Sequence, residues 1–323
     1  MPVTAPVAIE TRPLGHSGAA IPRVALGCGN FGGIGSSPAF FGQGASEEEA
    51  FAIMDAAWDL GISHFDTADA YGGGRSETII GNWMRSRGRA PLLTTKTHNP
   101  MEEGADAGLA PERMRRQLRS SLERLGVGHV DLYLTHEYDP DVASTEVVAT
   151  LEEFRAEGLI RASGVSNYDS AQLLETLGAG HVDAIQNSYS LLVREDERSG
   201  LLALCASEDV TYSVYSPLAG GWLTGKYRRG EEFPQGSRMT QRPEGYVSFQ
   251  TDQVFEALET LQAIGAARGI SMAGAALSWL LSSEQVGAIV VGPMRPDHLD
   301  PVREALESPL GPEDRRAVGE LFA

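Results

Sequence analysis

Short apolar segments alternate with amphipathic helical segments along almost the whole chain, and this alternation constrains the fold more than any other feature. Strands and helices that alternate build parallel sheets, because each helix carries the chain back before the next strand begins. Eight strands with helices around them close a barrel of about this chain length, 323 residues. We therefore predict a (β/α)8 TIM barrel, with an open doubly wound sheet as the competing fold. The predicted strands are Val24–Gly27, Ile62–Asp66, Leu92–Lys96, Val130–His136, Ile160–Ser166, Val182–Asn187, Val210–Ser216 and Ala288–Gly292.

Helix boundaries are also marked in the sequence. Ser46 followed three residues later by Glu49 forms the pattern of a capping box, so a helix is expected to begin there. A second helix is predicted from Pro111 to a stop at Gly126, because proline suits a first helical position and glycine suits the residue after the last. Both helices carry apolar residues at helical spacing, which predicts one buried face for each.

Three further segments complete the predicted architecture. Residues 12–23 predict a small N-terminal β-hairpin. The longest irregular stretches are residues 28–45, after the first strand, and 217–250, after the seventh, and long loops in a compact domain are usually functional. The sequence shows no linker and no internal repeat, so we expect residues 1–323 to form a single domain.

Composition excludes several function classes. The formal net charge of −18 disfavours nucleic acid or an anionic membrane as a partner. Two cysteines, Cys28 and Cys205, provide neither a disulfide framework nor a zinc site, so we expect no metal and a reducing, cytoplasmic location. No signal segment and no long apolar span is recognisable.

Residues 27–32 match the pattern G-x-G-x-x-G directly after a predicted strand. A dinucleotide-binding fingerprint requires a helix to begin at these glycines, so that the helix N-terminus meets the pyrophosphate. Here the chain continues as loop, and the next helix is predicted only after Ser46. No acidic residue closes a strand about twenty residues later either. We therefore interpret these glycines as part of a loop and not as a Rossmann site.

Polar residues are placed repeatedly at the C-terminal ends of the predicted strands. Asp66 and Lys96 end two of them, His136 ends a third, and Tyr71 lies on the glycine-rich turn after Asp66. In a barrel these strand ends share one face, which carries the active site. A lysine near a tyrosine stabilises the phenolate and lowers the tyrosine pKa, and a carboxylate keeps the lysine charged. A histidine beside them can hydrogen-bond a carbonyl oxygen, so the set suits proton delivery to a carbonyl that receives hydride.

The order of these residues and their neighbours resembles the aldo-keto reductase family over nearly the whole length of the chain. The resemblance implies a barrel that binds NADP(H) without a Rossmann fold. It implies Tyr71 as proton donor, tuned by Lys96 and Asp66, and His136 as the residue that orients the carbonyl. The matching motifs are Asp66-Thr67-Ala68-x-x-Tyr71-Gly72, Lys96 at a strand end, His136-x-x-Asp139-Pro140, Gly164-Val165-Ser166-Asn167, Gln186-Asn187, Tyr215-Ser216-Pro217-Leu218 and residues 220–226.

The resemblance also implies a cofactor site made by the later strand ends. Ser166, Asn167 and Gln186 would hold the nicotinamide carboxamide, Tyr215 would stack on its ring, and the loop over residues 217–226 would cover the pyrophosphate. The full set expected at the cofactor is Ser166, Asn167, Gln186, Tyr215, Ser216, Leu218, Gly220, Lys226, Gly292, Met294, Arg295 and His298.

The choice between the two dinucleotides depends on the segment after the eighth strand. Family members often carry basic and amide residues there that hold a 2′-phosphate, whereas here Arg295 is the one clear cation and His298 stands in a place often held by Arg or Gln. NADP(H) is favoured by resemblance, and NAD(H) stays open. For the substrate we expect contacts from Phe31, His98 and Trp222 at the barrel mouth.

The predicted function is therefore an NAD(P)H-dependent oxidoreductase that interconverts a small-molecule carbonyl and its alcohol. Aldehydes, ketosugars and ring ketones all stay open as substrates. One alternative is a nucleotide-sensing regulatory protein that keeps the barrel but acts through a partner. A second is a barrel aldolase in which Lys96 forms a Schiff base.

Overall fold

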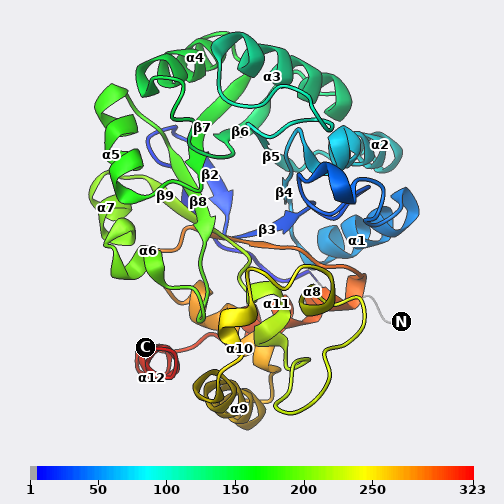
Figure 1. The fold of residues 1–323 in the computed structure, drawn as a ribbon, viewed down its shortest axis with the longest axis vertical. Coiled ribbons are helices and arrows are strands. Elements are labelled where there is room, and N and C mark those ends of the chain that lie inside the picture. Colours follow the sequence, from blue (N-terminus) through cyan, green and yellow to red (C-terminus); the bar gives the residue numbers. More distant parts are fainter. Residues whose placement is uncertain (1–5) are drawn as a thin grey trace.

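The computed structural model describes residues 6–323, and it confirms the predicted closed barrel (Figure 1). The strand order around the barrel is β10-β3-β4-β5-β6-β7-β8-β9, and neighbouring strands are parallel, so their C-terminal ends lie at one end of the molecule. The barrel strands are β3 (Val24–Gly27), β4 (His64–Asp66), β5 (Leu92–Thr97), β6 (Val130–Thr135), β7 (Ile160–Ser166), β8 (Ala184–Ser188), β9 (Thr211–Tyr215) and β10 (Ala288–Val291).

Helices form a ring outside the strands, and short 3-10 turns lie in the loops (Figure 1). The α-helices are α1 (Glu47–Leu60), α2 (Arg75–Arg87), α3 (Pro111–Leu125), α4 (Ser144–Ala156), α5 (Ser170–Ala179), α6 (Glu195–Arg198), α7 (Leu201–Ser207), α8 (Arg238–Gln241), α9 (Asp252–Ala267), α10 (Met272–Leu281), α11 (Asp300–Glu307) and α12 (Pro312–Glu320). The 3-10 turns are η1 (Pro38–Phe40), η2 (Tyr71–Gly74), η3 (Ala219–Thr224), η4 (Val247–Phe249) and η5 (Pro296–Leu299).

The local signals in the sequence determine the helix ends as expected. The Ser46 side chain accepts a hydrogen bond from the backbone of Glu49, while the Glu49 carboxylate accepts one from the backbone of Ser46, so the predicted capping box is present at the start of α1. Helix α3 begins at Pro111 and is followed by Gly126 in the left-handed conformation. The strand boundaries differ from the predicted ones by no more than two residues.

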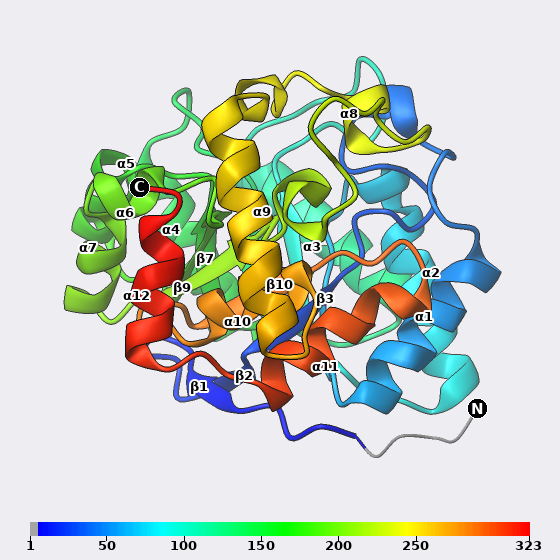
Figure 2. The same cartoon turned by 90° about the horizontal axis from the view of Figure 1, so that it is seen from below.

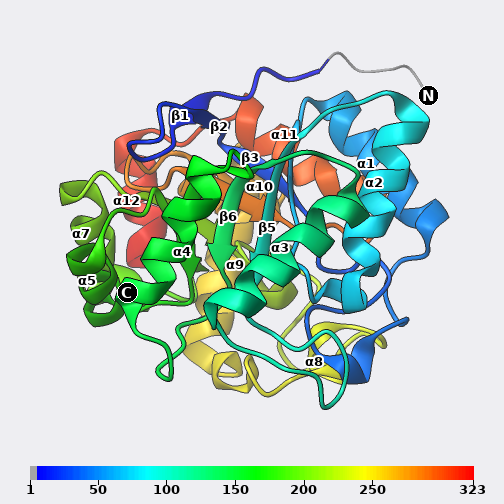
Figure 3. The same ribbon diagram turned by 90° about the horizontal axis from the view of Figure 1, so that it is seen from above.

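An N-terminal hairpin closes the end of the barrel opposite the strand C-termini. Its strands, β1 (Thr11–Pro13) and β2 (Ala20–Pro22), pair antiparallel, as predicted. Leu14 and Ile21 from the hairpin are buried in one cluster with Leu132 and Leu134 of β6. Figure 2 shows the hairpin and α8 at opposite ends of the barrel, and Figure 3 shows the same separation from the other side. The hairpin therefore leaves the strand C-termini as the accessible end.

Both long loops fold back on the barrel mouth. After β3 the backbone of Gly32 donates to Ala45, and Ala45 donates to Asn30, so residues 30–45 return on themselves before α1 begins at Glu47. No helix begins at residues 27–32, which confirms that the glycine pattern is not a dinucleotide-binding fingerprint.

Within residues 6–323, no single helix is long and apolar enough to cross a membrane. The helices α9 and α10 pass the same test only as a pair, and they are bent by 88° at the break between them.

Candidate active site

Lys96 is the centre of the polar group at the strand C-termini. It is completely buried at the end of β5, and its Nζ donates to Asp66 Oδ1 at 2.5 Å and to the backbone oxygen of Thr67 at 2.9 Å. The second carboxylate oxygen of Asp66 accepts from Gln186 Nε2 at 2.8 Å. Burial works to lower the pKa of Lys96, but the charges of Asp66 and Tyr71 outweigh it and the net pKa is raised. The lysine is therefore a fixed cation.

Tyr71 stands beside this cation on η2, directly after β4. Its ring centroid is 5.3 Å from Lys96 Nζ, and the β3 loop passes beside the ring at Gly29, where an added Cβ would make ordinary van der Waals contact at 3.5 Å. Burial raises the pKa of Tyr71, while Lys96 lowers it by charge and hydrogen bonding and Asp66 raises it. The sequence predicted only the lowering of the Tyr71 pKa by Lys96. In the structure burial has the larger effect on this pKa, so the phenol keeps its proton.

His136 lies next to Tyr71 at the end of β6. The two rings meet edge to face with centroids 5.5 Å apart, and the backbone of His136 donates to Thr97. Burial lowers the pKa of His136 well below its usual value, and the charges of Lys96 and His98 lower it further. The imidazole is therefore neutral near pH 7 and can hydrogen-bond a carbonyl oxygen without carrying charge.

The ends of β7, β8 and β9 form a shelf of amide and hydroxyl groups beside the buried lysine. Ser166 Oγ donates to the backbone of Gln186 at 2.7 Å, and Tyr215 Oη donates to Asn167 Oδ1 at 2.7 Å. Asn167 has a φ of 61°, which an asparagine tolerates better than most residues. Its amide nitrogen donates to the backbone oxygen of His136 at 2.9 Å. The structure thus brings together all four residues predicted to face the nicotinamide.

The loop after β9 continues this shelf. Ser216 has a φ of 53°, and glycines at 220 and 221 also have positive φ. Gly221 has a φ of 96°, in the left-handed region that favours glycine, and the exposed Lys226 side chain lies over it. Leu218 is half-buried beside these glycines. A bare backbone with one cation above it suits a pyrophosphate, so this loop fits the cofactor that the resemblance implies.

The segment after β10 presents a weaker anion site. Gly292, Met294 and Arg295 are exposed, and Arg295 donates to Asp297 Oδ1 at 2.8 Å. His298 Nδ1 lies 3.3 Å from the Met294 backbone nitrogen. The one clear cation of this segment is thus paired with a neighbouring carboxylate.

Of the three residues expected to contact substrate, Phe31 and Trp222 are buried and His98 is half-buried. Phe31 and Trp222 are completely buried, and Trp222 packs against Tyr227 of the second long loop and Phe255 of α9. Neither reaches the opening. His98 is half-buried next to Asn99 on the loop after β5, close enough to influence His136.

Sequence reasoning missed several residues that shape the site. Asn30 is buried and donates to the backbone oxygen of Pro293 at 3.0 Å, which joins the loops after β3 and β10. Asn99 lies 3.4 Å from His136, and Arg113 of α3 donates to the backbone of residue 99. Asn99 follows the Lys96 motif closely enough to be noticed, whereas Arg113 carried no signal beyond its place on the buried face of α3.

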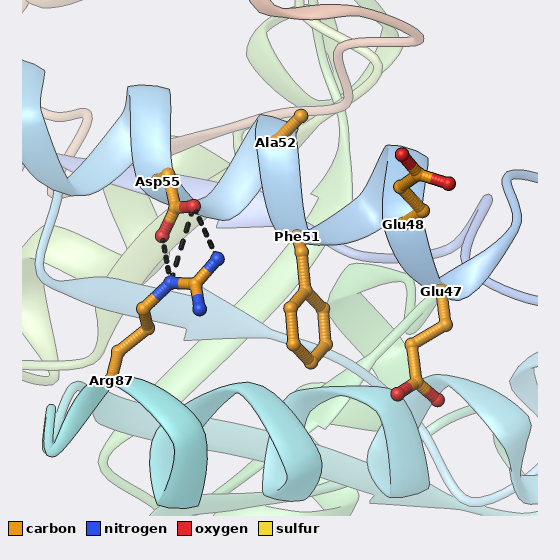
Figure 4. A pocket seen from close by; sticks show the side chains of 6 residues that line it. All are labelled: Glu47, Glu48, Phe51, Ala52, Asp55 and Arg87. Carbon is orange, nitrogen blue, oxygen red and sulfur yellow. Dashed lines mark hydrogen bonds and ion pairs between the residues drawn. The ribbon is translucent and has the colours of Figure 1, made fainter.

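A separate groove lies outside the barrel between α1 and α2. Figure 4 shows Phe51 pointing across it and Asp55 paired with Arg87, whose Nη2 lies 2.9 Å from Asp55 Oδ2. None of the predicted site residues lines it. The groove is formed by Glu47, Glu48, Phe51, Ala52, Asp55 and Arg87. Within residues 6–323, no group of three or more His, Cys, Asp or Glu side chains is arranged to hold a metal ion.

The barrel and the four side chains at its C-terminal end, Asp66, Lys96, Tyr71 and His136, together indicate an oxidoreductase of known family. The family model described as the Aldo/keto reductase family matches residues 23–322, so the chain belongs to this family of oxidoreductases. It is 32% identical to the NADH-specific methylglyoxal reductase of Escherichia coli, over 96% of this chain and 97% of that one. It is 28% identical to a Schizosaccharomyces pombe aldo-keto reductase named for NADP(+), over 85% and 80% of the two chains.

Solved structures agree with the fold. The glycerol dehydrogenase of Gluconobacter oxydans superposes with a TM-score of 0.81 at 26% identity, covering 100% of this chain and 96% of that one. Because the relatives include both NADH-specific and NADP-dependent enzymes, the family does not decide which dinucleotide this chain uses.

Proposed function

We propose that this protein is an NAD(P)H-dependent carbonyl reductase in which Tyr71 is the general acid. The observation that carries the proposal is the buried contact of Lys96 with Asp66 beside the Tyr71 ring. A charged lysine held by a carboxylate stabilises the phenolate that remains after Tyr71 gives up its proton.

The residues of the chain divide the reaction between them. A reduced nicotinamide held by these residues would supply hydride to the carbonyl carbon. Tyr71 transfers its proton to the carbonyl oxygen, and Lys96 stabilises the resulting phenolate. Neutral His136 hydrogen-bonds the same oxygen, which fixes its position against Tyr71. In the reverse direction the phenolate takes the proton of the alcohol, so the same residues serve oxidation.

The aldolase alternative is disfavoured by the state of Lys96. A Schiff-base lysine has to be neutral to attack a carbonyl, and such lysines have lowered pKa values. The pKa of Lys96 is raised, and two of its donor directions are occupied by Asp66 and Thr67.

For the cofactor we propose Ser166, Asn167, Gln186 and Tyr215 at the nicotinamide and the 216–226 loop at the pyrophosphate, with NADP(H) favoured over NAD(H). Arg295 would hold the 2′-phosphate. Replacing Arg295 by alanine is expected to weaken the binding of NADPH about tenfold or more and to change the binding of NADH little. The reason is that a charge-assisted hydrogen bond contributes about 1.5–3 kcal/mol. Fluorescence titration of both dinucleotides measures this, and equal effects on the two would place the phosphate elsewhere.

The test of the function is oxidation of NADPH and NADH, followed by absorbance, with aldehydes, ketosugars and cyclic ketones. Methylglyoxal belongs in the panel because a relative is named for it. Turnover of one substrate class supports the proposal. Tight dinucleotide binding with no turnover in either direction would instead favour the nucleotide-sensing alternative.

A further inference from the structure

Asn99 lies on the loop after β5, between two histidines. Its amide nitrogen faces His136 and its amide oxygen faces His98. Its Nδ2 is 3.4 Å from His136 Nδ1, and its Oδ1 is 3.4 Å from His98 Nδ1. An amide nitrogen donates and cannot accept, so the His136 nitrogen that it faces has to accept. We propose that Asn99 is a positioning residue that holds His136 as the neutral ring with its proton on Nε2.

This inference rests on the proposed function, because it concerns how His136 contacts a carbonyl. A neutral imidazole can donate a hydrogen bond from only one nitrogen. With Nδ1 engaged by Asn99, Nε2 is the nitrogen left to donate to substrate. Without Asn99, the ring has no fixed preference between its two neutral forms, and one of them presents a bare nitrogen to the carbonyl oxygen.

The position of Asn99 is itself fixed by a buried guanidinium. Arg113, which is 3% exposed, donates from Nη2 to the Asn99 backbone oxygen at 2.7 Å. Its Nη1 donates to Gly108 O at 2.9 Å and to Thr97 Oγ1 at 3.0 Å. Thr97 in turn donates to Asp69 Oδ2 at 2.6 Å. Because Asp69 precedes Tyr71 by two residues, one set of contacts links the segments that carry both reacting side chains.

Burial, with the charges of Lys96 and His98, keeps the His136 ring neutral, so which of its two nitrogens carries the proton matters over the working pH range. The charged and titratable groups that face it are Lys96 from β5, His98 from the following loop and Tyr71 from η2. No carboxylate is among them. Replacing Asn99 by a carboxylate would therefore introduce an acceptor where the wild type has a donor.

Asn99→Asp tests the proposal directly. We expect nitrogen-proton correlation spectra of protein labelled in histidine to show His136 protonated at Nε2 in the wild type and at Nδ1 in the variant. Turnover of the variant should be at least tenfold lower at pH 8. That gap should narrow toward pH 6, because the new carboxylate favours the imidazolium, which donates from both nitrogens.

Two results would overturn the proposal: an Nδ1-protonated His136 in the wild type, or a variant with the wild-type spectrum and pH profile. Asn82→Asp makes the same change on α2, where the Asn82 side chain contacts Glu47 and Arg85, and is expected to alter neither the His136 spectrum nor the pH profile. If Asn99→Asp does not fold, Asn99→Ser is expected to give a mixture of the two ring forms; a single Nε2-protonated form in this variant would also overturn the proposal.

Arg113→Lys tests the contact between Arg113 and the Asn99 backbone. A lysine cannot donate in three directions from the same plane, so we expect kcat to fall, dinucleotide affinity to be retained and His136 to show both ring forms. Unchanged ring protonation would remove Arg113 from the proposal. If the wild type reduces no carbonyl, the proposed function fails, while the spectra still decide the role of Asn99.

Discussion

Each face of β5 contacts an ion pair, a fully buried one on the inner face and a partly exposed one on the outer face. Lys96 faces the inside of the barrel, next to Leu134, and pairs with Asp66. Thr95 faces the ring of helices and donates to Glu77 Oε1 at 2.5 Å, while Arg124 Nε donates to Glu77 Oε2 at 2.7 Å. Thr95 and Lys96 are consecutive residues, and consecutive side chains of a strand point to opposite faces. One therefore belongs to a structural contact and the other to the candidate site.

The two ion pairs differ in the groups that their cations, Arg124 and Lys96, contact besides the carboxylate. Arg124 fixes α3 to the first turns of α2 through the Glu77 carboxylate, whose two oxygens both accept hydrogen bonds from protein donors. Lys96 binds Asp66 and also acts on Tyr71, a group that can exchange a proton. The inner pair is therefore the one whose cation acts on a phenol at the candidate site.

Tyr71→Phe should produce the largest effect. We expect kcat to fall about 10²- to 10⁴-fold with dinucleotide affinity retained, because the proton donor is removed while the cofactor contacts remain. Steady-state kinetics and fluorescence titration measure the two quantities. Tyr133→Phe is the matched control, since Tyr133 packs against Phe154 on the outer side of the sheet. Equal losses in both variants would contradict the distinction between the faces.

Arg124→Met should separate stability from activity. Removing one partner of a buried pair costs about 3–5 kcal/mol, and the lower end is expected because Arg124 is 22% exposed. Urea unfolding should show this loss, while kcat per folded molecule stays unchanged. A large fall in kcat with little loss of stability would show that the outer pair also takes part in the chemistry.

Asp69→Asn should change how stability depends on pH. Burial raises the pKa of Asp69 to about 7, so between about pH 4 and pH 7 the folded chain holds a proton that the unfolded chain has lost. The free energy of unfolding then falls with rising pH by up to about 1.4 kcal/mol per unit. The asparagine variant should lose this slope. The exposed Asp141→Asn should keep it, and a variant slope equal to that of the wild type would refute the assignment.

Thr95→Val should have the smallest effect. It removes the hydroxyl donor to Glu77 and leaves a buried carboxylate oxygen short of one hydrogen bond, at a cost of about 1–3 kcal/mol. Thermal or urea unfolding measures it, and kcat is expected to match the wild type. A change in the pH profile of turnover would indicate that the two faces communicate through the strand.

Much of the fold and the centre of the site could be predicted because their signals are local. The apolar strands, the capping box at Ser46 and the polar strand ends at Asp66 and Lys96 each lie within a few residues of sequence. Parallel strands in a barrel then bring their ends together without further information. That residues 1–323 form one domain stays a prediction.

The contacts that were missed depend on loop conformation. Asn30 reaches Pro293 across 263 positions of sequence, and Arg113 reaches Asn99 only because the loop between β5 and α3 returns to the helix. Trp222 was expected at the opening because long loops often present aromatic residues. Instead Tyr227, Phe233 and Phe249 of the same loop pack around Trp222, together with Phe255 of α9, and the indole is buried.

The chain contains only two lysines, and their exposures differ completely. Lys96 is fully buried, whereas Lys226 lies exposed over Gly221 in the loop after β9. Reagents that acylate amines under native conditions therefore have one lysine available within residues 6–323. A fluorophore or crosslinker attached to Lys226 would report on that loop from a known position, without any engineered cysteine.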